Sequence, residues 1–319
     1  MNNPVFSSLL PVVLLTAIGF VAGRAGWIRA EATKDLSNLV FVVLTPALLF
    51  RAMSSVHIEQ LNFKPVALYF VAVAVVYVAV FVTQGHNTRA AVLGLAATFS
   101  NTVMIGIPLI GMAYGQAALV LLLTLISVHA LILLTAATIV LEVIEARQLA
   151  GAGQGAATVP RHAGQTVLTA IKNGLIHPVP LPIIIGLLFA QTGLVIPEVL
   201  NRPLQLLGNA FGPMALLLVG ATLAQVRVGS HWRSALTISL LKNLLLPGLV
   251  AAVGWLAGSR GPDLTVMIAA ASLPIGANVF LFAQRYQVAQ DLATASMAVS
   301  SVLGLLSITL VMSLLALLA

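Results

Sequence analysis

Long apolar runs separated by short polar loops make up almost the whole of this 319-residue chain. A helix that crosses the hydrocarbon core of a bilayer needs about 20 mostly apolar residues. On that measure the pattern predicts ten spanning helices in an all-α integral membrane protein. They lie at residues 4–23, 36–54, 65–84, 90–113, 117–141, 167–191, 204–226, 234–257, 264–284 and 290–318.

The fourth predicted span is interrupted by polar and helix-breaking residues. The stretch 97–115, ATFSNTVMIGIPLIGMAYG, carries Ser100, Asn101, Thr102, Gly106 and Pro108. A proline inside a helix removes a backbone hydrogen bond and clashes with the preceding turn, so we expect the chain to break or unwind here. Irregular backbone at membrane depth is tolerated only where protein buries it or a watery cavity solvates it. This stretch is therefore a candidate binding site.

The ninth predicted span repeats the same design. The stretch 269–286, AAASLPIGANVFLFAQRY, contains Ser272, Pro274 and Asn278. Two interrupted spans at matching places in two halves of a chain are typical of the substrate site of a transporter. The alternative is that both stretches are proline-kinked helices that only pack, since proline and glycine are common in spanning helices.

A linker rich in Gly, Ala and Gln divides the ten predicted spans into five and five. The sequence predicts a first repeat at 1–144, a cytoplasmic linker at 145–165 and a second repeat at 166–319. Because each half has an odd number of spans, the second half enters the membrane from the opposite side. Two halves with one fold would be inverted repeats. Aligning Tyr114 with Tyr286 sets Ser100 against Ser272.

Composition agrees with a membrane protein, because 60% of the residues are hydrophobic, 7% are charged and the mean hydropathy is +1.08. The first positive charge, Arg24, follows the first apolar run, so this run is expected to be a retained span and not a signal peptide. The basic residues that give the net charge of +7 are scattered through short loops, which argues against a nucleic-acid partner. The absence of cysteine excludes disulfides and thiolate chemistry.

The distribution of basic residues predicts the orientation, because cytoplasmic loops carry an excess of Lys and Arg. With both termini outside, four basic residues face the exterior and ten lie in inner loops. The outer four are Arg51, Lys64, Arg202 and Arg260, and the inner ten are Arg24, Arg29, Lys34, Arg89, Arg147, Arg161, Lys172, Arg227, Arg233 and Arg285. We expect a multi-pass protein of the cell's inner (plasma) membrane.

Three motifs resemble the auxin efflux carrier family, part of the bile acid and auxin transporter-like superfamily. SNTVMIGIPLIGMAYG resembles that family's fourth-helix signature, LPIGANVFLFAQRY its ninth helix, and QDLATASMAVSSVLGLLSI its tenth. In the eighth span Lys242 stands five residues before Pro247, a spacing at which the family commonly has a basic residue. The resemblance covers essentially the whole chain.

The resemblance implies ten helices in two inverted five-helix repeats, with helices 4 and 9 crossing beside the substrate. It also implies a scaffold domain and a transport domain. Asn101 matches an asparagine that contacts the substrate carboxylate in the plant carriers, and Pro274 matches the crossover proline. Ser100 departs from the family pattern, since plant carriers have proline there, and the long cytoplasmic loop of the larger plant members is missing.

Polar residues in the spans are candidates for contact with an anion. Asn101 and Thr102 could donate to a carboxylate beside the positive end of a half-helix, or could only form hydrogen bonds between helices. Lys242 lies near the middle of its span, where a charge usually marks a pathway, unless it snorkels to the interface. His129 could relay protons or bind an anion, although a neutral packing histidine is the commoner case.

We therefore predict a secondary carrier that moves a small organic anion, of the carboxylate type, by alternating access, as a uniporter or exporter. It is not expected to be an enzyme or to hold a cofactor or metal, and it could form a homodimer in the lipid bilayer. One alternative is a sodium- or proton-coupled symporter of the bile-acid type. An intramembrane hydrolase is disfavoured, because no aspartate pair, HExxH or GxSxG motif occurs in a span.

Overall fold

The computed structural model describes residues 4–151, 179–226 and 229–318. The α-helices are α1 (Pro4–Arg24), α2 (Ala30–Leu39), α3 (Thr45–Met53), α4 (Phe63–Thr83), α5 (Thr88–Ala96), α6 (Ile107–Gly151), α8 (Pro180–Gln191), α9 (Glu198–Gln225), α10 (Trp232–Leu240), α11 (Leu246–Leu256), α12 (Gly261–Ser272), α13 (Asn278–Arg285) and α14 (Gln290–Leu318). Three π-helical turns, Val40–Leu44, Thr102–Gly106 and Leu241–Leu245, and two short 3-10 turns complete this part of the chain.

Six helical segments of the described residues are long and apolar enough to cross a membrane. They are Ala30–Met53, Phe63–Thr83, Thr102–Leu141, Glu198–Gln225, Trp232–Leu256 and Gln290–Leu315. Leu9–Arg24 and Pro180–Gln191 are shorter apolar helices. The chain is thus an all-helical, multi-pass membrane protein, as the hydrophobic pattern predicted.

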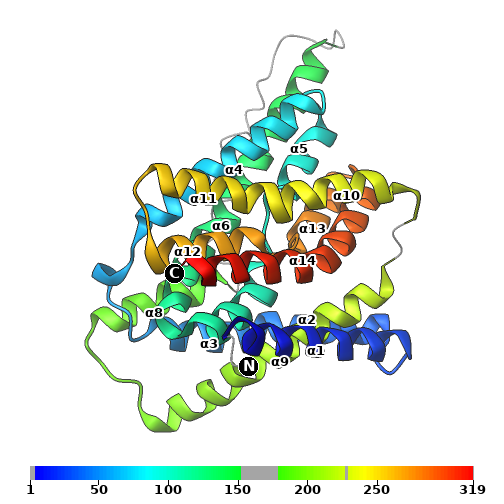
Figure 1. Cartoon of the computed structure of the whole chain (residues 1–319). Coiled ribbons are helices and arrows are strands. Elements are labelled where there is room, and N and C mark those ends of the chain that lie inside the picture. The colour runs from blue at the N-terminus through cyan, green and yellow to red at the C-terminus, as the bar shows by residue number, and fades with distance from the viewer. Residues whose placement is uncertain (1–3, 152–178, 227–228, 319) are drawn as a thin grey trace.

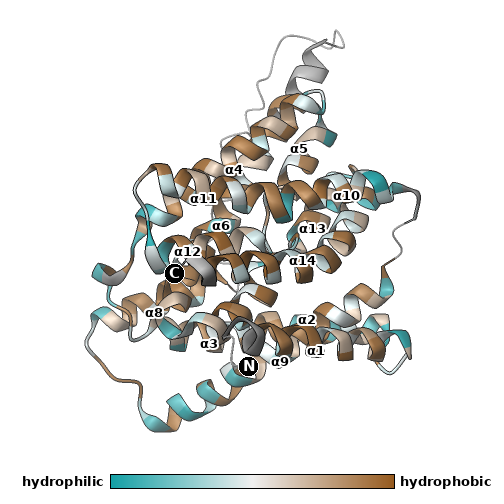
Figure 2. Cartoon of the chain, viewed as in Figure 1, coloured by the Kyte–Doolittle hydropathy of each residue, from teal (hydrophilic) through white to brown (hydrophobic). Residues whose placement is uncertain are grey.

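The outward faces of the long helices are apolar. On α4 the exposed residues Val71, Val75, Val78 and Val82 recur every three or four positions and so form one stripe. Figure 2 shows hydrophobic residues along the helices and hydrophilic ones gathered mainly at their ends and in loops. A stripe of this kind would be unfavourable in water, and lipid tails are its natural surroundings.

The helices form two layers (Figure 1). One layer contains α1, α2, α3, α8 and α9, and the other contains α4, α5 and α10 to α14. Helix α6 packs on both layers and continues past α11 to the far end of the molecule beside α4 and α5. The first of these layers is called the α1/α9 layer below, and the second the α4/α14 layer. Residues far apart in sequence are thereby brought together, since α1 packs chiefly on α9 and α4 packs on α11.

The α1/α9 layer is held by close helix crossings at glycines. A Cβ added to Gly19 of α1 would overlap the Leu217 carbonyl oxygen of α9, and one added to Gly220 of α9 would overlap the Thr16 carbonyl oxygen of α1. Gly186 of α8 similarly approaches Phe50 of α3, at 2.7 Å. Small residues let spanning helices pack backbone to backbone. This layer is therefore a tightly packed unit.

Proline does not break the fourth span, contrary to our expectation for Pro108. Pro108 is the second residue of α6, the helix that directly follows the π-helical turn Thr102–Gly106. Pro46 and Pro247 stand at the same place after the other two π-helical turns. The wider turn accommodates the missing proline N–H and its ring, so the helix continues past each proline.

The break in the fourth span lies earlier, at Ala97–Asn101, between α5 and the π-helical turn. The ninth span breaks at Leu273–Ala277, between α12 and α13, so there Pro274 does lie within the break. The helix ends on either side of the two breaks set Ser100 against Gly276, a register that differs from the one based on Tyr114 and Tyr286. A kink at Gly115 (φ 77°) then divides α6 into two helices.

Two other predicted boundaries differ from the observed ones. Helix α6 continues to Gly151, into the predicted linker 145–165. Of the predicted span 167–191, the structure describes only 179–191, where α8 begins at Pro180. Residues 152–178, with the rest of the linker, lie outside the described residues.

Candidate functional site

The two broken spans cross and complete each other's backbone hydrogen bonds. The Asn101 N–H donates to the Pro274 carbonyl oxygen at 2.8 Å, and the Gly276 N–H donates to the Phe99 oxygen at 3.0 Å. Ser100 and Ile275 thus form an isolated antiparallel bridge. Because backbone groups in a membrane interior must be paired, each break stabilises the other. This crossing is called the crossover below.

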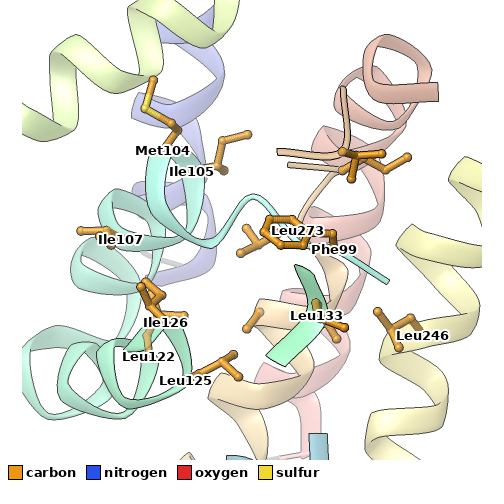
Figure 3. Close-up of a cluster of buried hydrophobic side chains, with 14 of the residues drawn as sticks. Phe99, Met104, Ile105, Ile107, Leu122, Leu125, Ile126, Leu133, Leu246 and Leu273 are labelled. Atoms are coloured by element: carbon orange, nitrogen blue, oxygen red, sulfur yellow. The ribbon is translucent and has the colours of Figure 1, made fainter. Parts of the chain in front are cut away.

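Gly276 lets the two backbones approach. A Cβ at this position would lie 2.9 Å from Phe99 Cδ1 and 3.1 Å from the Ser100 oxygen, which is closer than side chains normally pack. Figure 3 shows Phe99 and Leu273 in the middle of the apolar cluster around the crossover. Apolar side chains therefore surround the crossover within the protein.

Asn101 begins the second half of the fourth span. Its side-chain Oδ1 accepts the Met104 N–H at 3.2 Å, and its carbonyl oxygen accepts the Gly106 N–H at 3.1 Å. Asn278 is the first residue of α13, the second half of the ninth span. A helix N-terminus carries a partial positive charge of about half a unit. Two such positive ends meet at the crossover.

A cavity of about 60 Å³ lies beside the crossover. Five predicted site residues line it: Ser100, Asn101, Thr102, His129 and Asn278. The other lining residues are Phe41, Phe99, Val103, Met104, Ile126, Ala130, Val179, Gly276 and Ala277. Small-molecule pockets usually measure about 300–1,000 Å³, so the cavity has to widen before it can hold an organic anion.

Three polar side chains of the cavity have free hydrogen-bonding groups. Within the part of the chain that the structure describes, no acceptor is bound by the Asn101 amide nitrogen, and the side chains of Thr102 and Asn278 form no hydrogen bond. Thr102 is only 3% exposed. Asn101 and Asn278 are half-buried, and all three side chains line a cavity that two helix N-termini face. The arrangement suits a ligand with several negatively charged oxygens.

His129 reaches the crossover through Tyr69 of α4. The Tyr69 hydroxyl lies 3.1 Å from Ser100 Oγ and 3.3 Å from His129 Nε2, and all three side chains are buried. The Phe99 ring stacks at a tilt on His129, with ring centroids 4.7 Å apart. Tyr69 was not among the predicted site residues, because a tyrosine in an apolar span has no local signal of a polar contact.

Lys242 is fully buried and lies outside the cavity lining. Its Nζ donates to the carbonyl oxygens of Ala271 at 2.6 Å and Leu273 at 2.7 Å. It neither snorkels to the membrane surface nor faces the free amides of the cavity. Its contacts are instead with the last turn of α12 and the first residue of the break.

A second buried network, also absent from the prediction, fixes the ninth-span break. The Ile275 N–H donates to Ser300 Oγ at 2.9 Å, and that hydroxyl donates to Asn243 Oδ1 at 2.7 Å. The Asn243 amide nitrogen in turn donates a hydrogen bond to the Ser300 carbonyl oxygen at 2.8 Å. The one hint of this network in the sequence is that Asn243, a polar residue in an apolar span, directly follows Lys242.

Four predicted residues support the crossover without lining the cavity. Ser272 donates to the Ala269 oxygen at 2.8 Å within α12, and Pro274 accepts the Asn101 N–H. Gly106 faces Leu273, whose Cδ1 would lie 2.8 Å from an added Cβ. Pro108 lies near Gly212 of α9. These four residues shape the backbone around the cavity, and their role in binding stays a prediction.

A larger hollow of about 410 Å³ lies elsewhere, between the loop-side ends of α5, α10 and α14. Arg89, His231, Gln287 and Asp291 are among its lining residues, and all four are exposed. It includes no residue of either break. By volume alone this hollow would be the better candidate for a binding site. The free polar groups and the helix N-termini make the smaller cavity at the crossover the better candidate.

The fold and site define a membrane transport protein built around two broken, crossing helices. Over residues 4–312 the chain matches the family described as Membrane transport protein, and it belongs to this family, which includes the auxin efflux carriers. The family and its relatives are transporters and not enzymes.

Several relatives align over nearly their full length. A protein of Rhizobium meliloti (strain 1021) named "Putative malonate transporter" is 25% identical, with 94% of this chain and 92% of the relative covered. "Uncharacterized transporter YfdV" of Escherichia coli (strain K12) is 24% identical, with 93% and 92% covered. "Auxin efflux carrier component 8" of Arabidopsis thaliana is 22% identical, with 94% of each chain covered.

Proposed function

We propose that this protein is a secondary carrier of a small carboxylate, which binds at the crossover between the two broken helices. The observation that carries this proposal is the pairing of two helix N-termini with the free groups of Asn101, Thr102 and Asn278 around one cavity. Helix N-termini and amide donors bind carboxylates well. The similarity to a protein named for malonate makes a short dicarboxylate the first candidate.

The carrier works by alternating access, and its two layers provide the moving parts. The glycine-packed α1/α9 layer is suited to stay fixed, while the α4/α14 layer carries the crossover. A shift of one layer against the other would open the cavity to either side in turn. Both breaks are five residues long, and Gly19 of α1 and Gly186 of α8 make similar crossings. These matches favour ten helices in two inverted repeats.

The main alternative is a sodium- or proton-coupled symporter, and His129 is the residue that favours the proton-coupled form. It lines the cavity and is joined through Tyr69 to Ser100. Proton coupling through this chain would require His129 to change its protonation state during transport. A uniporter needs no such step.

The test is a thermal-shift screen of the purified protein with mono- and dicarboxylates, beginning with malonate. A ligand that binds the folded state at 100 times its Kd stabilises it by about 2.7 kcal/mol, which raises the melting temperature by several degrees. Sulfate and chloride at equal ionic strength are the controls. A screen in which no carboxylate raises the melting temperature above these controls would refute the proposal.

A further inference from the structure

Lys242 lies in the π-helical turn Leu241–Leu245 and has no exposed surface. Its ammonium contacts the carbonyl oxygens of Ala271, in the last turn of α12, and of Leu273, the first residue of the break in the ninth span. The last carbonyls of a helix have no partner within the helix, and together they carry about half a negative charge. The ammonium therefore satisfies and neutralises the end of α12 where water is scarce.

The counter-charge of Lys242 is this helix end and not a carboxylate. Lys242 forms no ion pair within the described residues. The acidic side chains that the structure describes lie at the surface: Glu31, Asp35, Glu59, Glu198 and Asp291 are exposed, and Asp263, in the first turn of α12, is half-buried. A buried cation without an acidic partner has to be stabilised by dipoles, and the two carbonyl contacts supply that stabilisation.

Unwound carbonyls and half-helix C-termini are the groups with which ion-coupled carriers hold a sodium ion. We propose that Lys242 is a tethered cation: its ammonium occupies the position where a coupling cation would bind the carbonyls of Ala271 and Leu273. The crossover is then assembled without a dissolved ion. As a statement about coupling, this inference rests on the proposed carrier function.

The surrounding network makes the inference testable, because it holds the break from the other side. Ile275 is fixed by Ser300, and Ser300 by Asn243, independently of the lysine side chain. Shortening Lys242 should therefore leave the two carbonyls in place around a space that a small cation can enter. Filling the same space with an uncharged side chain should leave no such site.

The experiment compares Lys242→Ala with the matched control Lys242→Met. Melting temperatures are measured without any organic anion, in equal concentrations of sodium, methylammonium or N-methylglucamine chloride. We expect the parent to melt at one temperature in all three salts. Lys242→Ala should melt lower by about 2–4 °C or more in N-methylglucamine and regain at least half of that loss in sodium or methylammonium. Lys242→Met should melt lower in all three salts alike.

Equal melting of Lys242→Ala in the three salts would overturn the inference. If this variant does not fold in any salt, the melting temperatures of Lys242→Arg and Lys242→Gln test the inference instead. A tethered cation requires the arginine variant to melt at a higher temperature than the glutamine variant. The reverse order would overturn the inference. Since no carboxylate is present, rescue by a cation can succeed even if the carrier proposal fails. The carboxylate screen can likewise succeed if cation rescue fails.

Discussion

The oxygen and the nitrogen of the Asn101 side-chain amide have different roles. The oxygen caps the second half of the fourth span by accepting the Met104 N–H, while the nitrogen faces the cavity with no acceptor among the described residues. A residue that stabilises the fold and also binds a ligand is hard to test by deletion, because its loss affects both. Substitutions that keep the cap can separate the two tasks.

Asn101→Asp should fold with nearly parental stability and lose anion binding. Aspartate caps helices as well as asparagine does, and a negative charge is favourable at a helix N-terminus. Yet two like charges about 4 Å apart repel by about 4 kcal/mol at an effective dielectric constant of 20, which weakens binding by about a thousandfold. Asn101→Ser, which also caps, should lose only the amide donor and bind about ten- to a hundredfold more weakly. Titration calorimetry with malonate measures both, and parental affinity in the aspartate variant would place the site elsewhere.

The crossover joins elements that are about 175 residues apart in the chain, and its formation depends on the close contact at Gly276. Backbone pairing between Asn101 and Pro274 and between Gly276 and Phe99 exists only while the two breaks touch. A side chain added at this contact would push the half-helices apart and expose four backbone groups that have no other partner nearby.

Gly276→Ala should therefore destabilise the protein by about 1–3 kcal/mol and abolish carboxylate binding. The matched control is Gly111→Ala in α6, where an added Cβ would meet no atom within 4 Å. In that helix alanine should be neutral or stabilising by up to about 1 kcal/mol. Chemical or thermal denaturation in detergent compares the two variants. Equal stability of both would show that the contact at Gly276 is unimportant.

The apolar pattern predicted most of the helices, because about 20 apolar residues in sequence have few other stable arrangements. It also predicted that Ala97–Asn101 and Leu273–Ala277 lie in interrupted spans. It misplaced the cause of the first break, since a π-helical turn absorbs Pro108. Tyr69, Asn243 and Ser300 could not be predicted, because their partners come from other helices and no local spacing marks such contacts.

The orientation of the whole molecule in the membrane remains a prediction from its loop charges. The natural absence of cysteine makes it simple to test, since each introduced thiol is the only one. Ala257, in the loop between α11 and α12, should face the exterior, and Gln84, between α4 and α5, the cytoplasm. In intact cells a membrane-impermeant maleimide should label Ala257→Cys and leave Gln84→Cys unlabelled until the cells are opened. The opposite pattern would invert the topology.

The central claim is that a carboxylate crosses the membrane through the crossover without a coupling ion. An inside-negative potential is worth about 2.3 kcal/mol per charge per 100 mV, enough to expel a monovalent anion nearly fifty-fold.

The direct measurement is efflux of labelled malonate, or of the carboxylate that gives the largest thermal shift, from proteoliposomes under a potassium diffusion potential. Sodium and proton gradients are imposed or omitted at fixed voltage. The account predicts that the inside-negative potential accelerates efflux with or without either gradient, and that Asn101→Asp vesicles show none. Efflux no faster than from protein-free vesicles, or efflux that requires the sodium gradient or the proton gradient, would contradict it.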